Sequence, residues 1–148
     1  MRRENVDRLR ETLNDLSTLT QEDLIPKISI DMQMPLGYIN EAFVDELELL
    51  EPFGKGNIKP VFVEKNIEIL SARILGKNKN VLKMQVQDAP GTQMDAMYFG
   101  DVEAFLEFFR EKYGKPAVDG LLRGQRSKVE AAFTYYPGIN EYMGQKTV

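Results

Sequence analysis

The sequence predicts an α+β protein, mostly β, built on a small five-stranded barrel with a helix between the third and fourth strands. From about residue 60 onward, apolar residues alternate along several short segments that are separated by turn residues. A helical apolar pattern follows the third of these segments. The apolar face of the first segment also switches near Ile69 and Leu70, as it does at a β-bulge in a strand that bends around a barrel. Other small α+β sheets remain the alternative.

Composition narrows the possible functions. The chain has 148 residues, 43% hydrophobic and 28% charged, which is typical of one globular core with a small flanking piece. It contains no cysteine and no histidine, so we expect no disulfide, no Ser-His-Asp centre and no zinc–thiolate site. No apolar run is long enough to span a membrane, and a cytoplasmic location is expected. The net charge of −4 argues against a uniformly basic nucleic-acid binder but leaves a local basic groove possible.

Residues 1–50 are predicted to form a helix, a strand and a second helix that do not complete a core of their own. An amphipathic helical stripe begins at Val6 and ends at Leu16. Residues 27–34 alternate as a strand, whose sheet partner must come from later in the chain or from outside it. Asn40 is the expected N-cap of the second helix, over residues 40–50. We interpret this part as the remnant of another domain.

Residues 51–60 are too rich in backbone-breaking residues for either regular element. Gly54 and Gly56 can adopt positive φ, and the only large apolar side chain, that of Phe53, is expected to enter a core. The segment is therefore interpreted as a rigid interdomain joint. A glycine loop that cradles phosphate is the alternative, but no Gly-Lys-Ser/Thr motif follows. The predicted joint residues are Pro52, Phe53, Gly54, Gly56 and Asn57.

The elements predicted after the joint follow the order strand, strand, strand, helix, strand, strand. This is the order of an oligonucleotide/oligosaccharide-binding (OB) barrel. Gly114 and Pro116 are expected to end the helix, and a fifth strand is expected to start near Ile139. The predicted ranges are 61–74, 82–87 and 93–99 for the first three strands, 102–113 for the helix and 129–135 for the fourth strand.

The joint resembles the segment that links the DHH-associated domain to the OB domain in RecJ-type exonucleases, which are specific for single strands. The pattern matches at residues 50–57 and at Pro60, Val61 and Phe62. Ile58 departs from it, because a proline is usual at that position. Residues 140–144 are similar to the family's Asn-Glu-Tyr-x-Gly turn into the last strand. The resemblance implies that residues 1–50 end a DHH-associated domain, 51–60 form the joint, and 61–148 form an OB domain with a shortened last strand.

The resemblance also implies where catalysis resides. The family's nuclease centre consists of aspartates and histidines around Mn²⁺ or Mg²⁺ in the DHH domain, and this chain has no histidine. We therefore expect no catalytic residue, metal or cofactor here. The longer parent protein is expected to be a metal-dependent single-strand DNA exonuclease of DNA repair and recombination.

The candidate function of this chain is single-stranded DNA binding, which requires a cationic groove for phosphates and flat side chains for base stacking. The alternatives are a solvated strand face or turn for the cations and a core position for the tyrosine on the third strand. The candidate DNA-binding residues are Arg73, Lys77, Lys79 and Lys83 on and between the first two strands, Tyr98 on the third, and Asn140, Tyr142 and Lys146 at the last turn.

Two further charged groups and several possible partners follow from the sequence. Glu103, Glu107 and Glu111 share one helix face, where a solvated face is favoured over a metal site. A basic turn over residues 123–128 is also expected to be solvated. The competing function is a protein-interaction module that docks repair partners, such as a single-strand-binding protein, and an independent enzyme is a third possibility. Exposed faces in residues 6–34 and the incomplete last strand favour a dimer.

Overall fold

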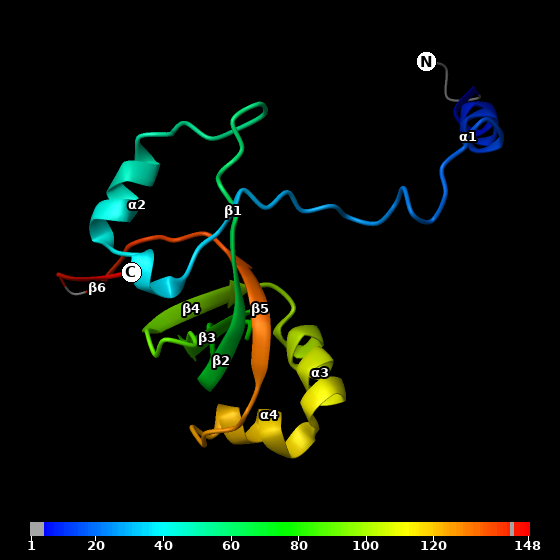
Figure 1. Ribbon diagram of the computed structural model, residues 1–148. Helices are drawn as coiled ribbons and strands as arrows, with labels where there is room; N and C mark the ends of the chain where they lie inside the picture. The colour runs from blue at the N-terminus through cyan, green and yellow to red at the C-terminus, as the bar shows by residue number, and fades with distance from the viewer. Residues whose placement is uncertain (1–4, 143) are drawn as a thin grey trace.

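A long, bent strand lies at the centre of the computed structural model, which describes residues 5–142 and 144–148 (Figure 1). This strand, β2, pairs with β3 and β5 in antiparallel fashion and with the short β1 in parallel fashion, and β3 pairs with β4. The result is a curled mixed sheet that forms a half-barrel. Its strands are β1 (Met32–Gln33), β2 (Phe62–Leu75), β3 (Val81–Gln87), β4 (Gln93–Phe99) and β5 (Glu130–Tyr135).

Two irregularities bend β2. The register against β3 shifts between Ile69 and Ser71, which confirms the predicted change of face. A second shift, against β5, lies between Glu64 and Ile67, and Asn66 there has a φ of 57°. An extra residue in one strand increases its local bend and twist, so β2 can pair with β5 along its first half and with β3 along its second.

Two helices cover the inner side of the sheet. They are α3 (Val102–Tyr113), which was predicted, and α4 (Lys115–Leu122), which was not. Gly114, with a φ of 84°, ends the first helix, and Pro116 lies in the first turn of the second, where proline is tolerated. The two helices contribute Leu106, Phe109, Val118 and Leu121 to a core that also contains Ile67, Ile69, Leu82, Met84, Val86 and Val129.

The segment before the joint contributes to the same core. A single 3-10 turn, Leu36–Tyr38, is followed by α2 (Glu41–Glu48), whose N-cap Asn40 accepts a hydrogen bond from the Phe43 amide at 2.9 Å, as predicted. Leu36 and Ile39 are buried in the core. The predicted strand over residues 27–34 shortens to β1, because only those two residues pair, and their partner is β2 from later in the chain.

The amphipathic helix α1 (Val6–Asp15) forms as predicted but lies apart from the sheet at the end of an extended arm (Figure 1). None of its residues is buried, and the exposed fractions of its stripe rise from 36% at Val6 to 60% at Leu13. Among the residues that the structure describes, no helix is long and apolar enough to cross a membrane.

The end of the chain differs from the prediction. The strands β6 (Asn140–Tyr142) and β7 (Gln145–Thr147) pair with each other in a separate two-stranded sheet. The fifth strand expected near Ile139 therefore does not join the barrel sheet. The outer edges of β4 and β5 have no strand partner in residues 5–142 and 144–148.

Candidate nucleic-acid interface

The outer face of β2, β3 and β4 carries cations beside exposed apolar side chains. Strand register places Arg73, Lys83 and Met97 in one row across the three strands. The next row contains Leu75, Val81 and Phe99. Phe99 is 71% exposed and Met97 44% exposed, so this face offers one aromatic ring and one thioether to solvent beside two positive charges.

The turn at residues 76–80 carries two further cations at the end of β2. The turn is closed by a 3.1 Å hydrogen bond from the Lys79 amide to the Gly76 carbonyl. Gly76 has a φ of 81° and Lys79 one of 53°, which gives the tight connection between β2 and β3. Lys77 and Lys79 are exposed, and Lys79 lines a groove with Ile74 of β2 and Val102 of α3.

One cation on the face has a carboxylate partner. Lys83 Nζ lies 2.7 Å from Asp95 Oδ2, and the two side chains are 45% and 44% exposed. An ion pair this exposed contributes about 1 kcal/mol or less, because water screens it. Lys83 can therefore exchange this partner for an incoming phosphate at little cost.

Tyr98 is not on this face. It pairs across the sheet with the fully buried Leu82, on the inner side, and its ring stacks on Phe105 of α3 with centroids 4.5 Å apart. The core position weighed as the alternative is therefore the observed one. The exposed aromatic is its neighbour Phe99, which the sequence analysis missed, although the alternation of β4 already places Phe99 on the face of Met97.

The last turn lies elsewhere, beside α2 (Figure 1). Lys146 Nζ contacts Glu41 Oε1 at 3.3 Å, and Asn140 pairs with Thr147 in the separate hairpin. The side chain of Tyr142 lies outside the described residues. The structure therefore does not bring Asn140 and Lys146 to the row of Arg73 and Lys83.

The joint is held by Asn57. Its Nδ2 donates to the carbonyls of Leu50 at 2.8 Å and Pro52 at 3.0 Å, while its backbone pairs with Gly54. Only Gly56 of the two glycines has a positive φ, at 92°. The prediction that Phe53 enters the core is wrong. Its side chain is half-buried, and Lys59 Nζ lies 5.9 Å from its ring centroid.

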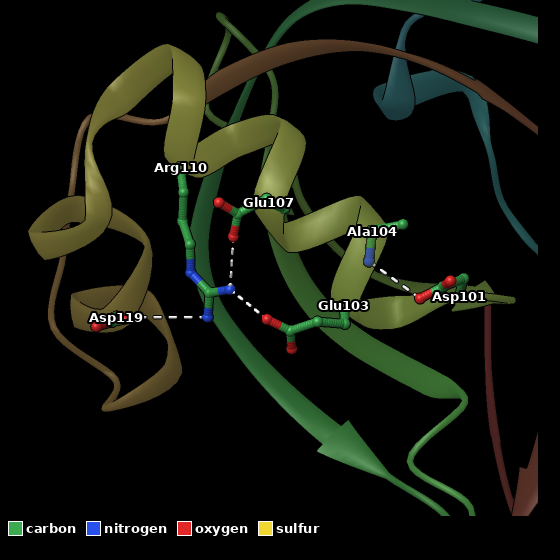
Figure 2. A network of polar contacts seen from close by, with 6 residues as sticks. All are labelled: Asp101, Glu103, Ala104, Glu107, Arg110 and Asp119. Carbon is green, nitrogen blue, oxygen red and sulfur yellow. Dashed lines mark hydrogen bonds and ion pairs between the residues drawn. The ribbon is translucent and has the colours of Figure 1, made fainter.

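The acidic face of α3 is occupied by an arginine rather than arranged for a metal (Figure 2). Arg110 Nη1 lies 2.5 Å from Glu103 and 3.1 Å from Glu107, and its Nη2 lies 3.6 Å from Asp119 of α4. The hydrogen bond that Arg110 donates to Glu103, followed by the one it donates to Glu107, raises the pKa of Arg110. No group of three or more acidic side chains in the described part of the chain could hold a metal ion. The Mn²⁺ or Mg²⁺ centre that the family resemblance implies is expected in the DHH domain, outside this chain, and not at these residues.

The second basic cluster, in the turn at residues 123–128, is exposed apart from the half-buried Ser127. Its Arg126 Nε lies 3.4 Å from Glu68 Oε1 of β2. This contact joins the turn to the sheet, so Arg126 of the cluster already has a carboxylate partner.

Comparisons with known proteins agree with the architecture. A model of the RecJ OB domain family matches residues 30–148. The single-stranded-DNA-specific exonuclease RecJ of Bacillus subtilis is 32% identical over 105 residues. That match covers 70% of this chain but only 13% of the relative, so this chain spans a small part of the relative's length.

Proposed function

The chain belongs to the RecJ OB domain family, and from that premise we propose that it binds single-stranded DNA through the outer face of β2, β3 and β4. The observation that carries the proposal is the row of Arg73, Lys83 and Met97 beside the exposed ring of Phe99. The strands and the turn between the first two are the usual ligand-binding surface of an OB-fold. The B. subtilis relative is, by its name, specific for single-stranded DNA.

The proposed contacts divide into two kinds. Arg73, Lys83 and the turn lysines Lys77 and Lys79 neutralise phosphates, which gives affinity that falls with salt. Phe99 stacks on a base, which is worth about 1–3 kcal/mol and tolerates any sequence. Because no described contact joins Asn140 or Lys146 to this surface, we propose for them only a second, weaker contact with the strand.

The proposed role in a longer protein is to guide a single strand toward a nuclease centre that uses Mn²⁺ or Mg²⁺ and lies outside this chain. In that protein, residues 1–50 end a DHH-associated domain, residues 51–60 set its angle to the barrel, and the OB barrel has five strands when complete. The protein would act in DNA repair and recombination in the cytoplasm.

A second candidate function is docking of repair proteins, such as a single-strand-binding protein, without affinity for DNA. The net charge of −4 favours it, because an acidic protein repels a polyanion at long range. The two candidates differ in the DNA binding that they predict. Substitution of Phe99 and the lysines is expected to weaken DNA binding under the first candidate, whereas the second predicts no DNA binding at all.

The test is fluorescence anisotropy with a labelled single strand at low and moderate salt. The double variant K77E/K83E is expected to weaken binding at least tenfold. It is also expected to flatten the salt dependence, since the slope of log K against log salt concentration falls by about 0.7 per lost phosphate contact. Phe99→Ala is expected to weaken binding at every salt concentration, because stacking is not ionic.

Matched controls keep the test specific. Lys55→Glu, in the joint, changes the charge by the same amount per residue but away from the face. Tyr38→Ala removes an aromatic ring away from the face, at a tyrosine that is 70% exposed. Equal losses in the controls, or no binding by the unaltered chain, would overturn the DNA proposal and leave protein docking. A nuclease assay with Mn²⁺ is expected to detect no turnover by this chain.

A further inference from the structure

Lys83 of β3 lies between two different neighbours on β4. In the strand register it stands opposite Met97, and on the same face of β4 the residues on either side of Met97 are Phe99 and Asp95. Diagonal neighbours in a sheet are about 7–8 Å apart, which a long side chain can span in either direction. The ammonium group of Lys83 can therefore lie beside the ring of Phe99 or beside the carboxylate of Asp95.

The observed ion pair selects the second of these positions. Lys83 Nζ lies 2.7 Å from Asp95 Oδ2, so the positive charge is held on the side away from Phe99. Arg73 is exposed beside Lys83 in the same row and forms no ion pair within residues 5–142 and 144–148. Asp95 therefore neutralises one of two neighbouring cations of this face and leaves the other.

Asp95 has a second hydrogen-bond donor close by. Gln85 stands directly opposite Asp95 in the register, and both residues are exposed. The Nε2 of Gln85 lies 3.4 Å from Gln93 Oε1, which is longer than the roughly 2.7–3.2 Å that is usual for such a bond. Gln85 can therefore turn this donor to Asp95 when Lys83 leaves, and only a weak hydrogen bond is lost.

We propose that Asp95 competes with the phosphates of a bound single strand for Lys83. In the free protein Asp95 holds Lys83 away from Phe99. When a base stacks on Phe99, the adjacent phosphate binds the ammonium group, and Asp95 accepts hydrogen bonds from water and from Gln85. When that nucleotide leaves, Asp95 binds Lys83 again, which suits a face that passes a strand along rather than retains it. This inference rests on the proposed DNA binding and adds the regulation of that site.

Fluorescence anisotropy with a labelled single strand at low salt tests the proposal. Asp95→Asn keeps the size of the side chain and removes its charge, and it is expected to tighten binding about two- to fivefold, the range that an exposed ion pair supplies. Glu111→Gln is the control, because it changes the net charge equally at an exposed position of α3, on the inner side of the sheet. It is expected to leave the affinity unchanged within error, and circular dichroism shows whether each variant is folded.

A double-mutant cycle separates competition from simple repulsion, because removal of a negative charge also reduces the repulsion of DNA. Repulsion by Asp95 acts whether or not Lys83 is present, whereas competition requires Lys83. The gain in affinity from Asp95→Asn is therefore expected to be at least about twofold larger in Arg73→Met protein than in Lys83→Met protein.

The possible outcomes distinguish this inference from the proposed function. Equal gains in the two backgrounds would overturn the inference and leave the proposed DNA binding intact. The same holds for a chain that binds the strand but gains nothing from Asp95→Asn. A chain that does not bind the strand at all would overturn both.

Discussion

At the residue scale, Tyr135 ties the end of β5 to the segment that precedes α2. Its hydroxyl donates to the Met34 carbonyl at 2.6 Å, and its ring lies 6.1 Å from that of Phe62. Burial, and then the nearby charge of Glu64, raises the pKa of Tyr135 to about 12. The neutral phenol is thus the form that the fold stabilises.

This shift makes stability sensitive to alkaline pH. A tyrosine in the unfolded chain ionises near pH 10, so the stabilisation by Tyr135 is complete below that pH. It is lost as pH rises through about 12, because the folded state resists release of the proton. Urea unfolding across this range is expected to give a steeper fall in the free energy of unfolding for the unaltered protein than for Tyr135→Phe. Parallel curves would contradict the assignment.

At the scale of elements, the joint contains two glycines, Gly54 and Gly56, that the sequence pattern does not distinguish. A Cβ built on either Gly54 or Gly56 meets no atom within 4 Å, so space does not distinguish them. Only Gly56 has a φ, 92°, that L residues rarely adopt. The requirement for glycine is therefore one of backbone conformation at a single position.

This pair provides its own control. Gly56→Ala is expected to lower the free energy of unfolding by about 1–2 kcal/mol, the cost of a left-handed conformation for a residue with a Cβ. Gly54→Ala is expected to change it by less than about 0.5 kcal/mol. Chemical denaturation of both variants measures the difference, and equal losses would mean that the turn does not require the positive φ.

At the scale of the whole molecule, α1 and its arm add little to the stability of the body. None of the helix's residues is buried, and its ion pair between Asp7 and Arg10 is exposed and 3.8 Å long. The core instead draws on residues from Leu36 onward. The body therefore has the contacts it needs without the first 25 residues.

Deletion of residues 1–25 is accordingly expected to leave the thermal midpoint within about 2 °C of that of the full chain, since no buried apolar contact is lost. Differential scanning calorimetry measures the midpoint, and far-UV circular dichroism should lose only the signal of one short helix. A fall of many degrees would show that α1 packs on the body in solution.

The sequence by itself determined the elements whose patterns are local. Alternation along β2, β3, β4 and β5, the helical period of α3 and the cap Asn40 each depend on residues a few positions apart. The bulge near Ile69 was predictable for the same reason, because one extra residue reverses the alternation. The sequence analysis missed α4 although Pro116 is a local signal for it, because a proline that ends one helix also suits the first turn of the next.

Only the tertiary structure decided which faces and edges meet. Tyr98 and Phe99 are neighbours in β4, yet packing of α3 made the first a core residue and left the second in solvent. The pairing of β1 with β2 joins residues 30 positions apart, and the hairpin of β6 and β7 lies outside the sheet. Periodicity assigns a side chain to one of two faces, but pairing over such distances depends on which surfaces the whole chain can bury. Periodicity therefore places Tyr98 and Phe99 on opposite faces of β4, but only the packing of α3 decides which of the two faces is buried.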